Sequence, residues 1–179
     1  MKKLLLLFFL FLAHISLGQQ KYTTSNGLVH FEASVPLFEA VAAQNNQVSC
    51  DLNATKSHIT FVVYITDFQF KRSLMKEHFN ANYIESHRYP KAIFKGIIEK
   101  FDLKNLATTP KTHYLNGTLY IHGKSKAIRV PAAIQKSETG IRIISDFIVD
   151  TDSFAITIPY IVRNKIAKKV QVSVVVNLE

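Results

Sequence analysis

The sequence has very little cysteine: of its 179 residues, only Cys50 carries a thiol. One thiol cannot form an intrachain disulfide, so the folded chain must be stabilised by its hydrophobic core alone. Small exported eukaryotic domains usually depend on disulfides, whereas an exported bacterial domain of this size does not need them. The cysteine content therefore favours a bacterial periplasm or cell exterior as the location.

The motifs of common enzyme classes are also absent. The chain has neither a G-x-x-x-x-G-K loop nor a G-x-G-x-x-G turn, which argues against nucleotide chemistry. It also lacks the G-x-S-x-G nucleophile elbow and the H-E-x-x-H pair of zinc ligands. His78 and His87 lie nine positions apart with carboxylates nearby, so a metal-dependent enzyme is a third-ranked hypothesis. We expect no catalytic residue, no metal and no cofactor.

Long apolar runs are confined to the N-terminus. Two lysines precede ten apolar residues, Leu4 to Ala13, and small residues follow up to Gly18. A membrane-spanning helix needs about 20 apolar residues. A secretory signal peptide instead has a basic start, a short apolar stretch and a small residue at its cleavage site. We therefore interpret residues 1–18 as a signal peptide and residues 19–179 as one domain, which is exported to the periplasm or secreted.

Negative charge is scarce relative to positive charge. The net charge of +9 falls to +7 when Lys2 and Lys3 leave with the signal peptide. A denser basic group lies near the C-terminus, at Arg163, Lys165, Lys168 and Lys169. Outside the cytoplasm the anionic partners are lipid head groups or polysaccharides, and no nucleic acid is expected. An anionic membrane surface is one candidate partner, and a solvated basic face is the alternative.

Apolar and polar residues alternate with a period of two through most of the remaining chain. The pattern is clear in GLVHFEASV (27–35) and in KVQVSVVVNLE (169–179). Turn signals near Gly123 and Gly140 separate further strands between these two. Short strands with regularly spaced turns predict an antiparallel sheet that closes into a barrel or folds into a sandwich.

One predicted strand, HITFVVYITDFQF (58–70), is apolar on both faces. Ile59, Phe61, Val63 and Ile65 lie on one face, and Val62, Tyr64 and Phe68 lie on the other. An antiparallel strand with one solvated face does not need this pattern. Either another segment covers the outer face, or the interior of the barrel is itself an apolar space for a ligand.

The best helix candidate is residues 71–80, where Leu74, Met75, His78 and Phe79 form a one-sided apolar stripe. It overlaps the polar stretch MKEHFNANYIESHRYP (75–90). We interpret this stretch as a corner that closes one end of the barrel, with polar side chains bonding the loop backbone. A lid over a ligand entrance is the second interpretation. Histidines 30, 58, 113 and 122 are expected at the surface, and Asp150 and Asp152 in a turn.

Three segments together resemble the YceI-like family. They are LMKEHFNANYIESHRYPKAIFKG (74–96), NGTLYIHGKSKAIRVP (116–131) and DFIVDTDSFAITIP (146–159), and the resemblance extends over the whole mature chain. The EHFN and YIES stretches are similar to the short exported form of Bacteroidetes-type bacteria. The resemblance implies an all-β fold: an extended antiparallel lipocalin-like β-barrel of about eight strands, with one or two short helices closing an end.

The better-studied members of that family hold a polyisoprenoid chain in the barrel lumen. The resemblance therefore implies non-enzymatic binding or transport of an amphiphilic lipid, such as a polyisoprenoid or an isoprenoid quinone. The alternative is an envelope module with a filled core that acts through its surface. The predicted lumen residues are Phe31, Phe61, Val63, Phe94, Leu119, Ile121, Phe147, Val172 and Val174.

Overall fold

The computed structural model describes residues 20–179, so the predicted signal peptide (1–18) lies outside the described residues. Nine strands lie within this range, and they form one antiparallel sheet. The strands are β1 (Lys21–Ser34), β2 (Ala42–Asn53), β3 (His58–Tyr64), β4 (Gln69–Phe70), β5 (Lys91–Ile98), β6 (Lys111–Ile121), β7 (Lys124–Lys136), β8 (Ile141–Asp150) and β9 (Ile166–Leu178).

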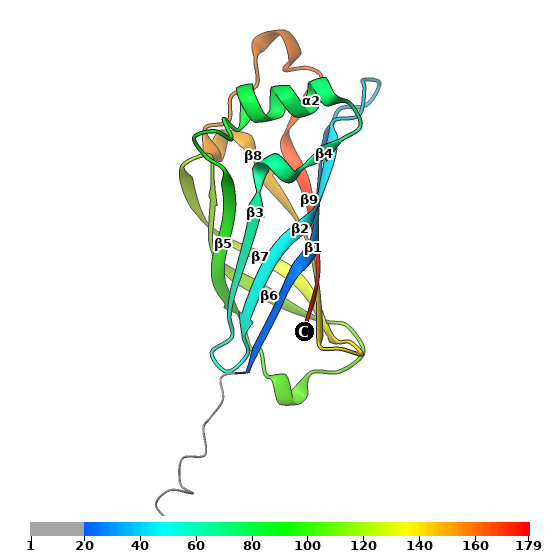
Figure 1. Ribbon diagram of the computed structural model, residues 1–179, viewed down its shortest axis with the longest axis vertical. Coiled ribbons are helices and arrows are strands. Elements are labelled where there is room, and N and C mark those ends of the chain that lie inside the picture. Colours follow the sequence, from blue (N-terminus) through cyan, green and yellow to red (C-terminus); the bar gives the residue numbers. More distant parts are fainter. Residues whose placement is uncertain (1–19) are drawn as a thin grey trace, which may run out of the picture.

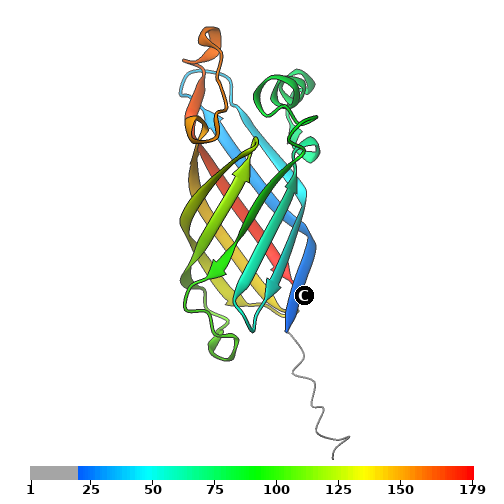
Figure 2. The ribbon, with the colours of Figure 1, turned by 90° about the vertical axis from the view of Figure 1, so that its left-hand side faces the viewer.

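The sheet closes on itself because β1 pairs with both β9 and β2. Around the barrel each strand lies beside the one that precedes or follows it in sequence, except that the short β4 only extends the edge of β2. The result is a tall up-and-down barrel of eight strands (Figures 1 and 2). The predicted all-β barrel of about eight strands is confirmed.

The short helices lie at the two ends of the barrel. They are η1 (Ile65–Asp67), α2 (Ser73–His78), η2 (Phe79–Tyr83), η3 (Leu103–Asn105), η4 (Thr151–Phe154) and η5 (Tyr160–Val162). Figure 1 shows α2 lying across one end, which we call the mouth, together with the loops 35–41 and 151–165. The opposite end, which carries η3 and the C-terminus, is the base. The predicted helix at 71–80 corresponds to α2, which continues as the wider turns of η2.

The single strand predicted over residues 58–70 is wrong beyond Tyr64. The turn η1 interrupts it, and the backbone N–H of Ile65 donates to the carbonyl of Pro90 at 2.9 Å. This turn changes the direction in which later side chains point. Phe68, which was expected on the outer face beside Tyr64, is therefore buried inside the barrel.

The base of the barrel is filled with close-packed aliphatic side chains. Inward residues of six strands are at most 1% exposed there: Leu52, Ile59, Ile98, Ile134, Ile141, Ile143, Val176 and Leu178. Burying an aliphatic side chain of this size stabilises the fold by about 1.5–3 kcal/mol. This packing in the base stabilises the described part of the chain, which has no disulfide because Cys50 is its one cysteine.

The wall of the barrel parts between β7 and β8 on the side of the mouth. These two strands pair only from Ala133–Ile144 to Lys136–Ile141, although both extend much further. Pro131 explains the interruption, because its carbonyl faces β8, where it accepts a 2.7 Å bond from Ser145 Oγ. An antiparallel residue directs its N–H to the same side, and proline has none to donate. The ladder therefore ends there, and the barrel widens towards the mouth.

Two valines on one face of β9 separate the packed base from the wider half. Val176 is fully buried in the base, whereas Val172 borders a cavity described below. We expect Val176→Ala to lower the free energy of unfolding by about 2 kcal/mol, because it leaves a void in a packed region. Val172→Ala should lower the free energy of unfolding by about 1 kcal/mol or less, because the Val172 side chain borders the cavity and already lacks packing contacts on that side. Urea denaturation of both variants checks this, and equal losses would contradict the division into two halves.

Candidate functional site

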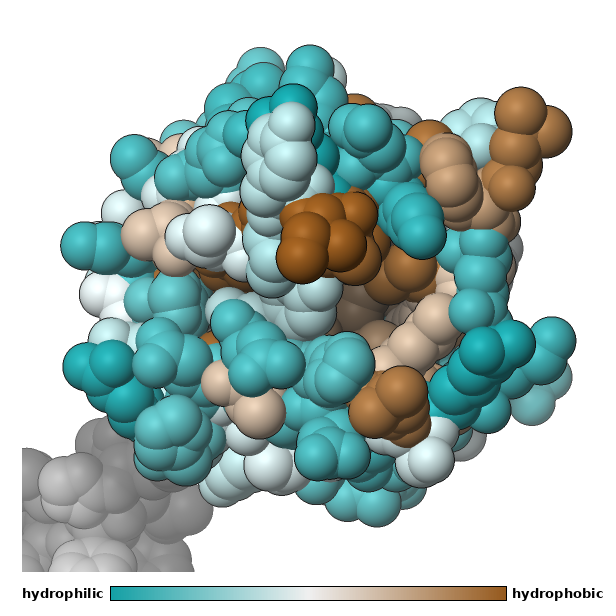
Figure 3. Space-filling model, turned by 90° about the horizontal axis from the view of Figure 1, so that it is seen from above, coloured by the Kyte–Doolittle hydropathy of each residue, from teal (hydrophilic) through white to brown (hydrophobic). Residues whose placement is uncertain are grey.

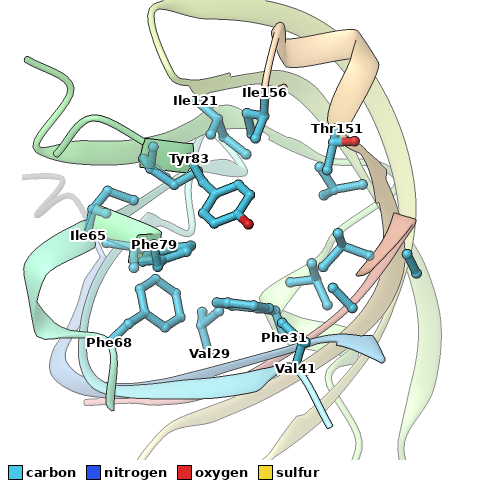
Figure 4. Close-up of a pocket in the computed structure, with 18 of the residues that line it drawn as sticks. Val29, Phe31, Val41, Ile65, Phe68, Phe79, Tyr83, Ile121, Thr151 and Ile156 are labelled. Carbon is cyan, nitrogen blue, oxygen red and sulfur yellow. The ribbon is translucent and has the colours of Figure 1, made fainter. Parts of the chain in front are cut away.

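A cavity of about 420 Å³ occupies the half of the barrel next to the mouth (Figure 4). Its wall comes from β1, β3 and β5 to β9, and it is completed by residues of α2, η2 and the 151–166 segment. Within the described chain, the base residues named above take no part in the lining. The cavity is therefore sealed below by the packed base and reached from the mouth, where Figure 3 shows a hollow edged by apolar side chains.

All nine side chains predicted to line the lumen border this cavity. They are Phe31, Phe61, Val63, Phe94, Leu119, Ile121, Phe147, Val172 and Val174. Their contact with a ligand stays a prediction. The sequence left open whether the barrel interior is hollow or filled, and the structure contains both: a hollow half at the mouth and a filled half at the base.

The apolar pattern on both faces of residues 58–70 now has a physical cause. Phe61, Val63 and Ile65 face the cavity, and η1 brings Phe68 to it as well. The outward Tyr64 is exposed, with Lys91 Nζ lying 4.6 Å from its ring centroid. The pattern therefore arises from the cavity and from the change of direction at η1, and the alternative of an outer covering is wrong at Tyr64.

A cluster of four phenylalanines forms one wall of the cavity, and only one of them was predicted. The rings of Phe31, Phe68, Phe70 and Phe79 form five close pairs, whose centroids lie between 5.1 and 5.9 Å apart. Figure 4 shows three of these rings, those of Phe31, Phe68 and Phe79. Edge-to-face and offset contacts of this kind add to the area buried by each ring. Phe79 belonged to the predicted helical stripe, but the inward direction of Phe68 and Phe70 depends on η1, which has no clear sequence signal.

The stretch 75–90 is both a corner and part of the cavity wall. Met75, His78 and Phe79 face the cavity, as do Tyr83 and Ile84 from η2 and its end. The predicted stripe is wrong at one position, because Leu74 is exposed.

Polar groups of the same stretch bond its backbone, as the corner interpretation requires. The side-chain Nδ2 of Asn80 donates to the backbone carbonyl of Lys76 at 2.8 Å. The backbone carbonyl of Asn80 accepts a bond from the backbone N–H of Ser86 at 2.8 Å. Capping of this kind compensates backbone groups that no strand can pair. The stretch therefore bonds its own backbone at the end of the barrel, in agreement with the corner interpretation.

His122 is more buried than the sequence suggested. It was expected at the surface, yet its side chain is only 12% exposed. Its Nε2 lies 3.0 Å from Glu85 Oε2 and its Nδ1 lies 3.0 Å from the Phe154 carbonyl oxygen. The Glu85 carboxylate and the Phe154 carbonyl are both acceptors, so the His122 ring is the donor in these contacts. We call this group the latch, because it joins the segment after η2, the β6–β7 turn and η4.

Backbone conformation marks the latch as well. Glu85, His122 and Ala155 have φ angles of 49°, 50° and 54°, in the left-handed region that residues with a Cβ rarely adopt. Gly123 has φ of 69° and packs against the ring of Tyr89, which leaves no room for a side chain. Three segments therefore each place a strained residue at the same junction. Such strain persists only where surrounding contacts stabilise it, and the latch supplies those contacts.

The cavity contains few polar groups. Figure 4 shows the hydroxyl of Tyr83 projecting into the space between the walls. Burial raises the pKa of the Tyr83 phenol above its ordinary value, so it is a neutral hydrogen-bond donor at neutral pH. Ser145 Oγ is already bonded to Pro131, and Thr151 Oγ1 is buried without a partner in the described part of the chain. Tyr83 and Thr151 are therefore two neutral polar groups of the lining that could meet a ligand, and the Tyr83 hydroxyl is the one that projects into the space.

The other chemical candidates lie away from the cavity. Cys50 is buried in the base, and burial raises the pKa of its thiol far above the usual range, so it is not a reactive thiolate. Asp150 Oδ1 accepts a bond from the Asp152 N–H at 3.0 Å, which confirms the turn-forming role. In residues 20–179 no three His, Cys, Asp or Glu side chains gather closely enough to hold a metal ion. No helix in that range is both long and apolar enough to cross a bilayer.

A closed antiparallel barrel with a sealed base and an apolar cavity at its mouth defines the class, which is a lipocalin-like β-barrel. The YceI-like domain model matches residues 21–178, which is nearly the whole chain. The protein therefore belongs to the YceI-like family, as the resemblance of its motifs predicted. A search of curated protein sequences gave no match.

Solved structures share this fold at low sequence identity. A polyisoprenoid-binding domain from Saccharophagus degradans, implicated in plant cell wall breakdown, is 16% identical with a TM-score of 0.75, covering 89% of this chain and 97% of its own. BcnA of Burkholderia cenocepacia is 14% identical with a TM-score of 0.68, covering 85% and 94%. The YCEI protein of Campylobacter jejuni is 18% identical with a TM-score of 0.57, covering 74% and 80%.

The latch predicts a pH-dependent contribution to stability. Bonds from His122 and then Arg88 lower the pKa of Glu85 below its ordinary value of 4.5. A lowered folded-state pKa means that the stabilisation is fully present above about pH 4.5 and is lost as the pH falls through the folded value. We expect Glu85→Gln to lower the Tm at neutral pH, with the difference from wild type shrinking below that range.

Thermal unfolding followed by circular dichroism at several pH values measures this difference. Glu138→Gln, in the exposed turn at the base, is the matched control and should leave the Tm unchanged throughout. A Tm difference for Glu85→Gln that stays constant down to about pH 3 would show that the carboxylate contributes nothing through its charge.

Proposed function

We propose that this protein binds and carries an amphiphilic lipid, a polyisoprenoid or an isoprenoid quinone, in the barrel cavity without catalysing a reaction. The observation that carries the proposal is the apolar cavity of about 420 Å³, closed at the base and accessible at the mouth. Ligand pockets typically have volumes of about 300–1,000 Å³. The Saccharophagus degradans domain, which shares this fold, is a polyisoprenoid-binding domain, and this supports the ligand class.

The hydrophobic effect supplies enough free energy for such binding. Each methylene group transferred from water into an apolar cavity contributes about 0.8 kcal/mol. Ten buried carbons therefore contribute roughly 8 kcal/mol, from which the cost of ordering and immobilising the chain must be subtracted. A chain that exceeds the cavity would leave its remaining length at the mouth. Affinity without any catalytic group is the expected outcome.

The hollow half of the barrel favours a carrier over the two alternatives. A module that acts only through its surface has no need of a cavity, since a filled interior is more stable. A metal-dependent enzyme would need ligands around one point, and His78 and His87 belong to no such group among residues 20–179. We also propose that the protein is exported to the periplasm or secreted, which would bring it to envelope lipids.

Native mass spectrometry of the protein purified without detergent tests the carrier function. Val172 faces the cavity, so Val172→Phe should occupy ligand space and weaken binding at least about tenfold while the barrel stays folded. The control is Ile148→Phe, which introduces the same phenylalanine side chain on the exposed outer face of β8. Loss of a lipid-sized adduct in the first variant alone supports the proposal. Equal occupancy in both variants would place the lipid elsewhere.

If the Tyr83 hydroxyl donates a hydrogen bond to the ligand, the protein should bind a lipid with a polar group more tightly than a plain hydrocarbon. Tyr83→Phe removes one neutral hydrogen-bond donor from the cavity, which should cost about 1 kcal/mol for a ligand with a carbonyl, hydroxyl or phosphate group. Binding of a hydrocarbon of equal length should not change. Titrations with a prenyl quinone and a matched hydrocarbon measure the difference, with Tyr120→Phe on the outer surface as control. Equal effects on both ligands would contradict a polar contact.

A further inference from the structure

Two loops at the mouth present large apolar side chains to solvent. The loop between β1 and β2 carries Leu37, which is fully exposed, and the half-exposed Phe38. The segment between η4 and β9 carries Tyr160 and Ile161, which are 75% and 87% exposed. Lys165 Nζ lies 6.0 Å from the Phe38 ring centroid, so the two loops are neighbours. Together these four residues form an apolar rim, a name we keep for them below.

The conformation of Leu37 makes its exposure more unusual. Its φ angle is 72°, which glycine or asparagine would adopt at lower cost than leucine. A polar residue at a solvent-exposed turn tip would also avoid hydrating an apolar side chain. The position therefore combines two unfavourable features that neither the barrel wall nor the packed base requires. A surface that is covered in use explains why the exposed side chain is a leucine.

Positive charge accompanies the apolar rim. Arg163 lies over the Tyr160 ring at 4.0 Å from guanidinium carbon to centroid, and Lys165 approaches Phe38. Among the ion pairs of residues 20–179, neither of these two basic groups contacts a carboxylate, whereas Lys168 is bound to Asp152 at 2.7 Å. The basic group expected from the sequence is thus divided: Lys168 is paired, whereas Arg163 and Lys165 lie beside exposed aromatic rings. This pairing suits an anionic surface with an apolar layer beneath it.

We propose that the apolar rim docks on a bilayer containing anionic lipids, with Leu37, Phe38, Tyr160 and Ile161 at the acyl boundary and Arg163 and Lys165 on head-group phosphates. Phe38 and Lys165 also line the cavity, so the docked rim would join the bilayer interior to the cavity. A lipid could then pass between them without crossing water. The inference rests on the proposed lipid-carrier function for its purpose, but the docking itself is measurable without any isoprenoid.

The test uses the protein lacking residues 1–18 and vesicles of phosphatidylglycerol and phosphatidylcholine that contain no isoprenoid. The sequence has no tryptophan, so Ile161→Trp introduces a single fluorescent reporter at the rim. Its emission should shift to shorter wavelength on addition of the anionic vesicles. Ile97→Trp, on the exposed face of β5 near the base, is the control and should not shift.

Charge reversal tests the basic residues with the same reporter. The double variant Arg163→Glu and Lys165→Glu should weaken partitioning onto anionic vesicles by about tenfold or more. Each basic residue near such a surface strengthens binding about fivefold, which corresponds to about 1 kcal/mol of binding free energy. Lys56→Glu with Lys104→Glu makes the same change in net charge at the base and should have a smaller effect. Replacing both Leu37 and Tyr160 by serine, with the reporter kept at position 161, should weaken binding to the same vesicles without altering the charge.

The outcomes separate docking from ligand binding. Weaker vesicle binding in the rim variants, with an unchanged lipid adduct in native mass spectrometry, supports docking as a distinct step. Vesicle binding that persists in a wild-type protein without any lipid adduct would refute the carrier and leave docking intact. Equal vesicle binding by rim and base variants would overturn the docking proposal. A rim that buries itself in a dimer in sedimentation experiments, with no shift on vesicles, would overturn it as well.

Discussion

The packing of aliphatic side chains in the base is the interaction on which the rest of the barrel depends. Eight strands enclose an interior just wide enough to be filled by side chains or to hold one small ligand. In this protein the base is filled, with residues such as Leu52, Ile134 and Leu178 almost completely buried. That packing stabilises the closed sheet without a disulfide. Because stability is concentrated there, the other half can remain hollow and the wall can part above Pro131.

The hollow half needs its own means of keeping shape, since a cavity lacks the contacts of a packed core. The phenylalanine cluster stabilises one side of the hollow half, where the ring of Phe31 from β1 packs against that of Phe79 from η2. The latch braces the other side, where Glu85, His122 and the Phe154 carbonyl join three segments. The shape of the mouth is therefore maintained by two different kinds of interaction, an apolar one and a charged one. Only the second responds to pH, which follows from the lowered pKa of Glu85.

Much of this could be predicted from the sequence, for a physical reason. Alternation requires only that inward residues be apolar, so it identified Val172 and Val174 as inward-facing and did so for Phe61 and Phe94 as well. The same alternation continues to Val176 and Leu178, which lie in the packed base. A residue in a cavity wall and a residue in a packed core must both have an apolar side chain. The pattern could therefore not tell the hollow half from the filled one.

The features that sequence reasoning missed all depend on contacts between distant segments. His122 reaches Glu85, which lies 37 positions away, and no spacing rule links a hairpin turn to the end of a helical stretch. The inward direction of Phe68 depends on η1, whose first N–H bonds the carbonyl of Pro90. Nothing in the local sequence indicates that Leu37 combines a positive φ angle with full exposure. Local sequence patterns specify faces, whereas these features are specified by tertiary geometry.

The 151–166 segment connects the latch to the apolar rim. At its start, the Phe154 carbonyl accepts from His122, and Phe154 and Ile156 are buried against the barrel. At its end, Ile166 pairs with Ser34 next to the loop that carries Leu37. Tyr160 and Ile161 are exposed between these two fixed points. A loop held at both ends loses less conformational entropy when it docks than one that is ordered only on contact. By fixing one end of this segment, the latch also helps to hold Tyr160 and Ile161 beside the cavity, in the position that the proposed docking requires.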